Sequence, residues 1–338
     1  MPYFGIDAVG GAERANANLI KILDYAENLV FYPISFNSVR RDYEFEGIQC
    51  IQDRVEEISK VTSSFEPDLV IVTHELIKVA MDLAYPYLIY LHDPRAHCLN
   101  ANTNHCNFNC NNCAFFLPSE IYRSAYKKAM AIAYCSNYLK SIAGNQYPEA
   151  NYLETPWFPL QNLRTGSFTA PANIIGTTAG VPHKGKDLLI KLAKSMKKTR
   201  FILVGPTNIE KFPANIKYLG YVPEENMFRD FYSKIGTYLS LAVHGEAYGM
   251  TIVESHAYGI PTLLPRSDGL SESGGCSSNF VEKENIENVN HWRSRLFELI
   301  EDVPLRERSI VHGHANYQIK RQYSKEIYAS LKRLLRKL

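Results

Sequence analysis

The stretch HGEAYGMTIVESHAYGIPTLLP, residues 244–265, decides the fold of this chain. It follows the apolar run TYLSLA (237–242), which is typical of a buried strand. Its segment GMTIVESHAYG has the small-residue and apolar spacing of a buried helix that ends at Gly259 and Pro261. A strand that leads through a loop into a helix, followed by the apolar run PTLLP, predicts parallel strands joined by helices.

The same alternation of apolar runs and amphipathic segments extends along the whole chain. In the first half we expect a helix at about residues 12–25 and strands in LVFYPIS, PDLVIVTHE, YLIYLHD and AIAYCS. In the second half we expect strands in NIIGTTAG, RFILVG, IKYLG, TYLSLA and PTLLP. The pattern predicts the α/β class, with parallel sheets covered by helices on both faces.

The length of 338 residues predicts two domains, because single cores usually stop growing below this size. The alternation breaks at residues 153–173, a stretch that contains Pro, Thr and Gly. We expect an N-terminal domain at 1–157, a C-terminal domain at 158–320, and a helix at 321–338 that returns to the first domain. Both are expected to be Rossmann-like and doubly wound, facing each other across a ligand-binding cleft.

The composition is that of a globular protein, with 46% apolar and 21% charged residues. No apolar run is long enough for a membrane helix, and no secretory signal is recognisable, so we expect a cytoplasmic protein. The net charge of +2 argues against a nucleic-acid partner.

The two glutamates of the opening stretch predict a nucleotide site. Glu246 is expected in a loop at the carboxyl edge of a strand, and Glu254 within the following helix. Gly249, Met250 and Thr251 would form the first turn, whose free N–H groups and helix dipole favour a phosphate. A carboxylate one turn further on can accept two hydrogen bonds from a ribose. The arrangement therefore suits a nucleoside diphosphate sugar.

The stretch EAYGMTIVESHAYGIPTLL resembles the E-x7-E signature of family-4 glycosyltransferases, also called group 1, which have the GT-B fold. Further similarity lies in GGAERANANLIKIL (10–23), in His92 of YLHDP, and in the runs AYCSNYLK, KGKDLLIKLA and NIKYLGYVPEENMFRDFYSK. These pieces occur in the expected order and cover nearly the whole chain.

The resemblance implies a role for each matching residue. Glu254 would hold the ribose, Glu246 would contact the donor sugar, and the N–H groups of residues 249–251 would bind the diphosphate. Lys184 would neutralise the charge that grows on the leaving diphosphate. The backbone of Gly10 and Gly11 would close over the phosphates, while His92 would touch the transferred sugar and support the oxocarbenium-like centre; these three residues belong to the other domain.

The resemblance also implies the reaction. A retaining glycosyltransferase would move a sugar from a UDP or GDP sugar to a hydroxyl acceptor, either lipid-linked or part of a polysaccharide or other glycan. No metal would be required for catalysis. A nucleotide-sugar epimerase and an inactive, glycosyltransferase-like binding protein remain as alternatives. A hydride-transferring dehydrogenase is disfavoured, because GIDAVGGAERA lacks the G-x-G-x-x-G spacing.

Two departures from the family pattern stand out. Ala179 occupies the position of the arginine in the family's R-x4-K-G motif, so the diphosphate loses a cation unless His183 or another basic side chain replaces it. In addition, the chain opens with MPYFGIDAVGG, which contains at most the end of the first strand. We therefore expect a truncated first strand and roughly 5–10 further residues upstream.

Four cysteines cluster in an Asn-rich segment at residues 92–116. Cys98, Cys106, Cys110 and Cys113 can supply four thiolates, and His97 and His105 are close in sequence. In a cytosolic protein this clustering favours a metal over disulfides. We predict structural zinc, with free thiols and an iron–sulfur cluster as the alternatives.

The following segment, FFLPSEIYRSAYKKAM (115–130), mixes aromatic residues with Arg123, Lys127 and Lys128. It predicts peripheral contact with the inner membrane face, where a lipid-linked acceptor would be available. A plain surface helix is the alternative.

Overall fold

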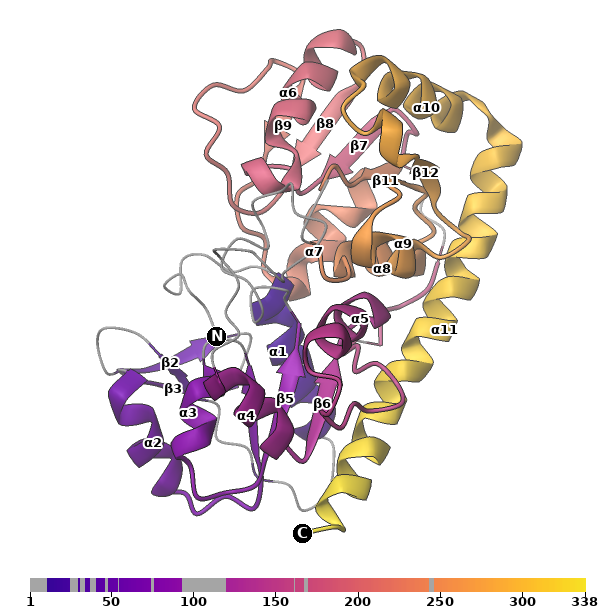
Figure 1. Cartoon of the computed structure of the whole chain (residues 1–338). Helices are drawn as coiled ribbons and strands as arrows, with labels where there is room; N and C mark the ends of the chain where they lie inside the picture. The colour runs from indigo at the N-terminus through magenta and orange to yellow at the C-terminus, as the bar shows by residue number, and fades with distance from the viewer. Residues whose placement is uncertain are drawn as a thin grey trace. The chain divides into compact units, whose positions relative to one another are not determined.

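The computed structural model describes residues 11–24, 30, 34–36, 41–45, 48–53, 55–73, 76–92, 120–160, 162–166, 170–242 and 246–338 (Figure 1). The chain divides into two compact units. Unit 1 contains residues 1–161 and 321–338, and unit 2 contains residues 162–320. Within the described ranges, no helix combines the length and the apolar character that crossing a membrane requires.

Unit 1 contains two separate sheets with the strand orders β1-β3-β2 and β4-β5-β6. The strands are β1 Ile34–Phe36, β2 Arg41–Phe45, β3 Ile48–Asp53, β4 Val70–Thr73, β5 Tyr87–Leu91 and β6 Ala131–Tyr134. The helices are α1 Gly11–Asp24, α2 Val55–Ser63, α3 Ile77–Asp82, α4 Glu120–Lys128 and α5 Asn137–Gln146.

The sheet β4-β5-β6 is parallel and forms the core of unit 1. Every residue of β5 and β6 is buried, as expected for strands covered on both faces. The hydroxyl of Tyr90 donates a hydrogen bond of 2.9 Å to the carbonyl of Trp157. Helix α11 (Val303–Leu335) contributes its residues from Arg321 onward to this unit. There the Ser324 hydroxyl accepts from the Leu160 N–H at 2.8 Å.

Strands β2 and β3 depart from the predicted alternation. They pair antiparallel, with Phe45 opposite Ile48, where the sequence pattern predicted only parallel strands joined by helices. The missed signal is local, because polar and apolar residues alternate along DYEF (42–45) and Gly47 lies between the two strands in sequence. Glycine in a two-residue connection between alternating segments is typical of a hairpin.

Unit 2 is built on one sheet of six strands. The strands are β7 Ile174–Thr177, β8 Arg200–Leu203, β9 Ile216–Tyr218, β10 Thr237–Leu239, β11 Thr262–Pro265 and β12 Asn279–Val281. The helices are α6 Lys186–Ser195, α7 Glu224–Asp230, α8 Met250–Ala257, α9 Asp268–Gly274, α10 Val289–Glu301 and the first part of α11, with short 3-10 helices η4 Pro182–Lys184, η5 Tyr232–Lys234 and η6 Lys283–Asn285.

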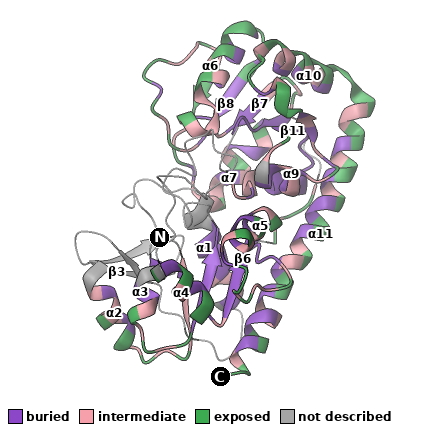
Figure 2. Ribbon diagram, viewed as in Figure 1, coloured by how far each residue is buried: buried purple, intermediate pink, exposed green. Residues whose placement is uncertain are grey.

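Helices cover both faces of this sheet. Successive residues of β8 alternate between two apolar clusters, since Phe201 and Leu203 belong to one and Ile202 to the other. The first cluster includes residues of α6 and α10, and the second includes residues of α7 and α8. The central strands β7, β10 and β11 are correspondingly buried, except for the half-buried Ile174 at the start of β7 (Figure 2). Unit 2 is therefore doubly wound, as the sequence predicted.

The order of the strands defines a switch point. The sheet runs β12-β11-β10-β7-β8-β9, and all of its pairs are parallel. The chain proceeds outward from β7 through β8 to β9, then returns to the other side of β7 to form β10. In open α/β sheets, ligands bind beyond the carboxyl ends of the two strands at such a point. The loops after β7 and β10 are therefore the expected binding loops of unit 2.

Helix α8 ends in a double hydrogen-bonded turn. The N–H of Gly259 donates to the carbonyl of His256 at 3.2 Å, and the N–H of Ile260 donates to Ser255 at 2.9 Å. Gly259 has a φ of 67°, which a glycine adopts without a steric penalty. The turn leads directly into β11.

His256 joins α8 to α11 and β11. Its Nδ1 lies 3.0 Å from Asn316 of α11, and its Nε2 lies 3.2 Å from the hydroxyl of Thr262 on β11. Asn316 also donates to the carbonyl of Ser273 on α9 at 2.8 Å. Burial, followed by the nearby charges of His314 and Lys320, lowers the pKa of His256 to about 3. The imidazole is therefore neutral at physiological pH.

We predict that His256 makes stability depend on pH. Because its pKa is about 3 in the folded state and about 6.5 in the unfolded state, the unfolded state binds an extra proton between these values. Stability is thus full above about pH 6.5 and falls toward pH 3. Denaturant unfolding at pH 7.5 and pH 5 should differ by about 2 kcal/mol through this residue.

The control for this prediction is His312, a histidine on α11. His256→Gln should flatten the pH dependence, whereas His312→Gln, which changes an exposed residue, should leave it as in the unmodified protein. An unchanged pH dependence in a folded His256→Gln protein would contradict the prediction.

Candidate nucleotide site

The loop after β7 approaches the segment after β10 closely at Gly185. Gly185 follows η4 with a φ of 88°, and a Cβ at this position would lie 2.3 Å from the carbonyl oxygen of Leu241. Only a residue without a side chain permits this approach. Lys184, the last residue of η4, is thereby brought beside the loop that follows β10.

Lys184 and Glu246 form an ion pair. The side chains are 32% and 19% exposed, so both charges remain accessible to a ligand. The carbonyl of Glu246 also accepts from the Gly269 N–H at 3.1 Å, which fixes its backbone to α9. The structure thus brings together Lys184 and Glu246, which the sequence analysis identified separately as candidate site residues. Solvent-accessible ion pairs contribute on the order of 1 kcal/mol, so a charged ligand can replace this one.

The first turn of α8 lies in the same loop region. Gly249 precedes the helix with a φ of 95°, and Met250 and Thr251 are its first two residues. Among the described residues, no backbone carbonyl accepts a hydrogen bond from these three N–H groups. Together with the positive end of the helix dipole, they are suited to an anionic group.

Glu254 lies inside α8 and is only 7% exposed. The hydroxyl of Tyr232, on η5, donates a hydrogen bond to its Oε2. A carboxylate offers about four acceptor positions, so this contact leaves capacity for ribose hydroxyls. Tyr232 was not anticipated from the sequence, because the contact spans 22 positions and follows from the packing of η5 on α8.

A hydroxyl bridge at the same place was also missed. The phenol oxygen of Tyr238 on β10 lies 3.1 Å from the hydroxyl of Thr178 and 2.7 Å from that of Thr251. Burial raises the pKa of Tyr238 to about 12, so the phenol stays protonated. The available signal was a tyrosine within a run expected to be a buried strand, since buried tyrosine hydroxyls usually find partners.

Ala179, at the position of the family's arginine, is 1% exposed and belongs to the apolar cluster beside α6 and α10. Its side chain contributes packing in place of charge. His183, the other basic residue considered from the sequence, is partly exposed and precedes Lys184 in η4.

The remaining predicted residues belong to unit 1. His92 follows β5, is 8% exposed and lies edge-on to Tyr90 with a ring separation of 5.6 Å. Gly11 begins α1, and Gly10 lies outside the described residues. Cys98, Cys106, Cys110 and Cys113 also lie outside them, so the zinc site stays a prediction.

Helix α4 buries some of its residues within unit 1 and leaves others available for a membrane surface. Tyr122 and Tyr126 are buried in unit 1, whereas Ile121 is exposed. Tyr126 stacks on Tyr147 at 4.0 Å. The membrane contact stays a prediction that depends on Ile121 and the basic residues rather than on these tyrosines.

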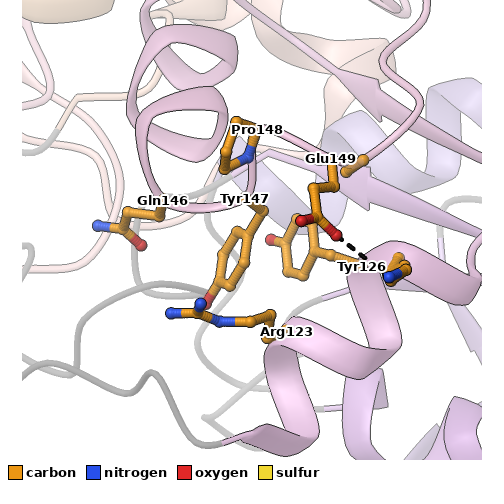
Figure 3. A pocket seen from close by; sticks show the side chains of 8 residues that line it. Arg123, Tyr126, Gln146, Tyr147, Pro148 and Glu149 are labelled. Atoms are coloured by element: carbon orange, nitrogen blue, oxygen red, sulfur yellow. Dashed lines mark ion pairs between the residues drawn. The ribbon is translucent and has the colours of Figure 1, made fainter.

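A small pocket lies between α4 and the end of α5 (Figure 3). Its volume is about 60 Å³, far below the several hundred Å³ of a typical ligand site. Across it, Lys127 pairs with Glu149 at 3.3 Å. The lining residues are Arg123, Tyr126, Lys127, Gln146, Tyr147, Pro148, Glu149 and Ala150. The pocket is too small to receive a sugar nucleotide.

By sequence, the chain matches no family model and no curated protein. By structure, it is similar to glycosyltransferases. Sucrose-phosphate synthase from Thermosynechococcus elongatus is 12% identical with a TM-score of 0.72, over 98% of this chain and 96% of that one. HepE from Anabaena, in complex with UDP and glucose, is 16% identical with a TM-score of 0.69, over 98% of each chain.

A third likeness is to the pneumococcal O-GlcNAc transferase GtfA in complex with UDP and GlcNAc. It is 15% identical with a TM-score of 0.63, over 89% of this chain. This chain spans 63% of GtfA, which is less than two thirds of its length. These likenesses show that the chain has the α/β fold of GT-B glycosyltransferases, and the predicted fold class is confirmed.

We predict that Gly249→Ala destabilises unit 2 through both strain and overpacking. A Cβ at Gly249 would lie 2.8 Å from Ile252 Cδ1 and 2.9 Å from Leu270 Cδ2, in addition to the cost of the positive φ. Gly205 provides the matched control, because its φ is 91° and a Cβ there would have open space for 4 Å around it. Denaturant unfolding should show losses of about 2–4 kcal/mol for Gly249→Ala and about 1 kcal/mol for Gly205→Ala. Equal losses would show that the contacts at Gly249 carry no cost.

Proposed function

We propose that the protein is a retaining glycosyltransferase, which transfers a sugar from a nucleoside diphosphate sugar to a hydroxyl acceptor. One observation carries the proposal. A partly exposed cation, a partly exposed carboxylate and a helix N-terminus meet where ligands bind in such sheets, beyond β7 and β10. Lys184 and the first turn of α8 suit a diphosphate, and Glu246 suits the hydroxyls of a sugar.

In the proposed reaction, the bond between the anomeric carbon and the diphosphate oxygen breaks, and its electron pair stays with the diphosphate. The acceptor oxygen bonds to the anomeric carbon, and the acceptor's proton passes to the departing diphosphate. Lys184 and the N–H groups of residues 249–251 would stabilise the charge that accumulates on the diphosphate. Glu246 would orient the sugar through its carboxylate, and Glu254 would hold the ribose. His92, in unit 1, would contact the transferred sugar.

The likeness to HepE and GtfA, whose structures hold UDP, favours a UDP sugar over a GDP sugar as the donor. The acceptor we propose is a hydroxyl of a lipid-linked molecule or of a glycan. A retaining mechanism is proposed from the resemblance to family 4 in the stretch from Glu246 to Glu254.

The test of the ribose role is calorimetric titration with UDP, GDP and ADP. We expect one nucleotide, UDP, to bind, and Glu254→Ala to weaken that binding at least tenfold because two hydrogen bonds to the ribose are lost. Glu282→Ala is the control, since it removes a glutamate whose ion pair with Arg266 is 49% exposed on both sides. Absence of binding to the folded protein, or equal binding to both variants, would contradict the proposal.

A second prediction separates binding from transfer. Glu246→Gln frees Lys184 from its ion pair, so UDP without a sugar should bind about two- to fivefold more tightly. Sugar transfer should fall at least a hundredfold, because the carboxylate that orients the sugar is gone. Calorimetry and a transfer assay on the same protein measure both effects. A parallel loss of UDP affinity and transfer would show that Glu246 does not compete for Lys184.

The burial of Ala179 favours a second candidate function, that of a glycosyltransferase-like binding protein without turnover. A family site that lacks its arginine has one cation fewer for the leaving diphosphate. Release of UDP from a UDP sugar in the presence of a hydroxyl acceptor distinguishes the two candidates. Tight UDP binding without any UDP release would favour the binding protein.

A further inference from the structure

We propose that Tyr238 is a positioning residue for the donor diphosphate, a role that rests on the proposed function. Its hydroxyl ties together the two segments that would hold the diphosphate. Thr178 lies on the loop that leads from β7 to Lys184, and Thr251 lies in the first turn of α8. The phenol bridges their hydroxyls at 3.1 and 2.7 Å.

The phenol ring is fixed by the sheet. Tyr238 pairs with Gly176 of β7 and Thr262 of β11, so it stands in the middle of the sheet. It is 1% exposed and belongs to the apolar cluster on the α8 side, where it meets Phe231 edge-on at 6.4 Å. Because the ring is packed in this way, the position of its hydroxyl is fixed. The hydroxyl has one proton to donate and can also accept, so it can serve both threonines at once.

This bridge lies beside the position at which the family-4 pattern has an arginine. Ala179 is the residue next to Thr178, and its side chain lies in the apolar core. Ala179 therefore offers the diphosphate no charge, and in this loop Lys184 would supply the positive charge. The phenol keeps this loop and the N–H groups of α8 at a fixed separation. A diphosphate that contacts both segments requires that separation, whereas a monophosphate can bind to one segment alone.

The experiment compares UDP with UMP by calorimetry on the full chain. In Tyr238→Phe the bridge is lost while the ring remains, so UDP affinity should fall about fivefold and UMP affinity less than twofold. Thr251→Val removes the same bridge from its other end and should reproduce this selective loss, which keeps the test valid if one variant does not fold. The double variant should lose no more UDP affinity than Tyr238→Phe alone, because that change already removes both hydrogen bonds of the bridge.

Tyr317→Phe is the matched control. Tyr317 is a fully buried tyrosine of the same unit whose hydroxyl also makes two contacts, at 2.8 and 3.2 Å, both with the backbone of Leu163. It should lose comparable stability in denaturant unfolding and keep the ratio of UDP to UMP affinity.

The outcomes separate this proposal from the proposed function. If the unmodified protein binds UDP and transfers sugar, but Tyr238→Phe retains its UDP affinity or loses UDP and UMP equally, the positioning role is overturned and the function stands. If the folded, unmodified protein binds neither nucleotide, the proposed function fails and the positioning role fails with it.

Discussion

The site in unit 2 depends on the adjacency of β7 and β10. Because these strands are parallel neighbours, their carboxyl ends lie at one edge of the sheet. Because the chain passes outward through β8 and β9 before it forms β10, the loops after β7 and β10 come from parts of the chain that are far apart in sequence. The loop after β7 carries Lys184, and the loop after β10 carries Glu246 and leads into α8. Charges far apart in the sequence thus meet as a consequence of strand order.

Two kinds of interaction maintain this arrangement. The supports are uncharged: the close approach of Gly185 to Leu241, the Tyr238 hydroxyl between two threonines, and the buried, neutral imidazole of His256 within α8. The charged groups, Lys184 and Glu246, are partly exposed. Buried hydrogen bonds define positions at little electrostatic cost, whereas an exposed ion pair can exchange with a ligand. Rigid neutral supports beneath an exchangeable charged surface are well suited to an anionic substrate.

Much of this fold could be predicted from local pattern. Apolar runs predicted β5, β6 and the strands β7 to β11, and the spacing in residues 244–265 predicted α8 and its end near Gly259. These features could be predicted because they depend on residues that are neighbours in sequence. The β2–β3 hairpin was missed, since its short alternation was outweighed by the helical pattern around it. The contacts of Tyr238 and Tyr232, and the pairing of Lys184 with Glu246, could not be predicted. They join residues brought together only by the sheet order, which the residue types alone did not specify.

The most direct measurement of the central claim is a crystal structure of the protein with UDP bound. Our account predicts that the phosphates lie against the N–H groups of Gly249, Met250 and Thr251, that Lys184 has exchanged Glu246 for a phosphate oxygen, and that the ribose meets Glu254. UDP bound elsewhere in the chain, or bound here with the Lys184–Glu246 pair intact, would contradict the account.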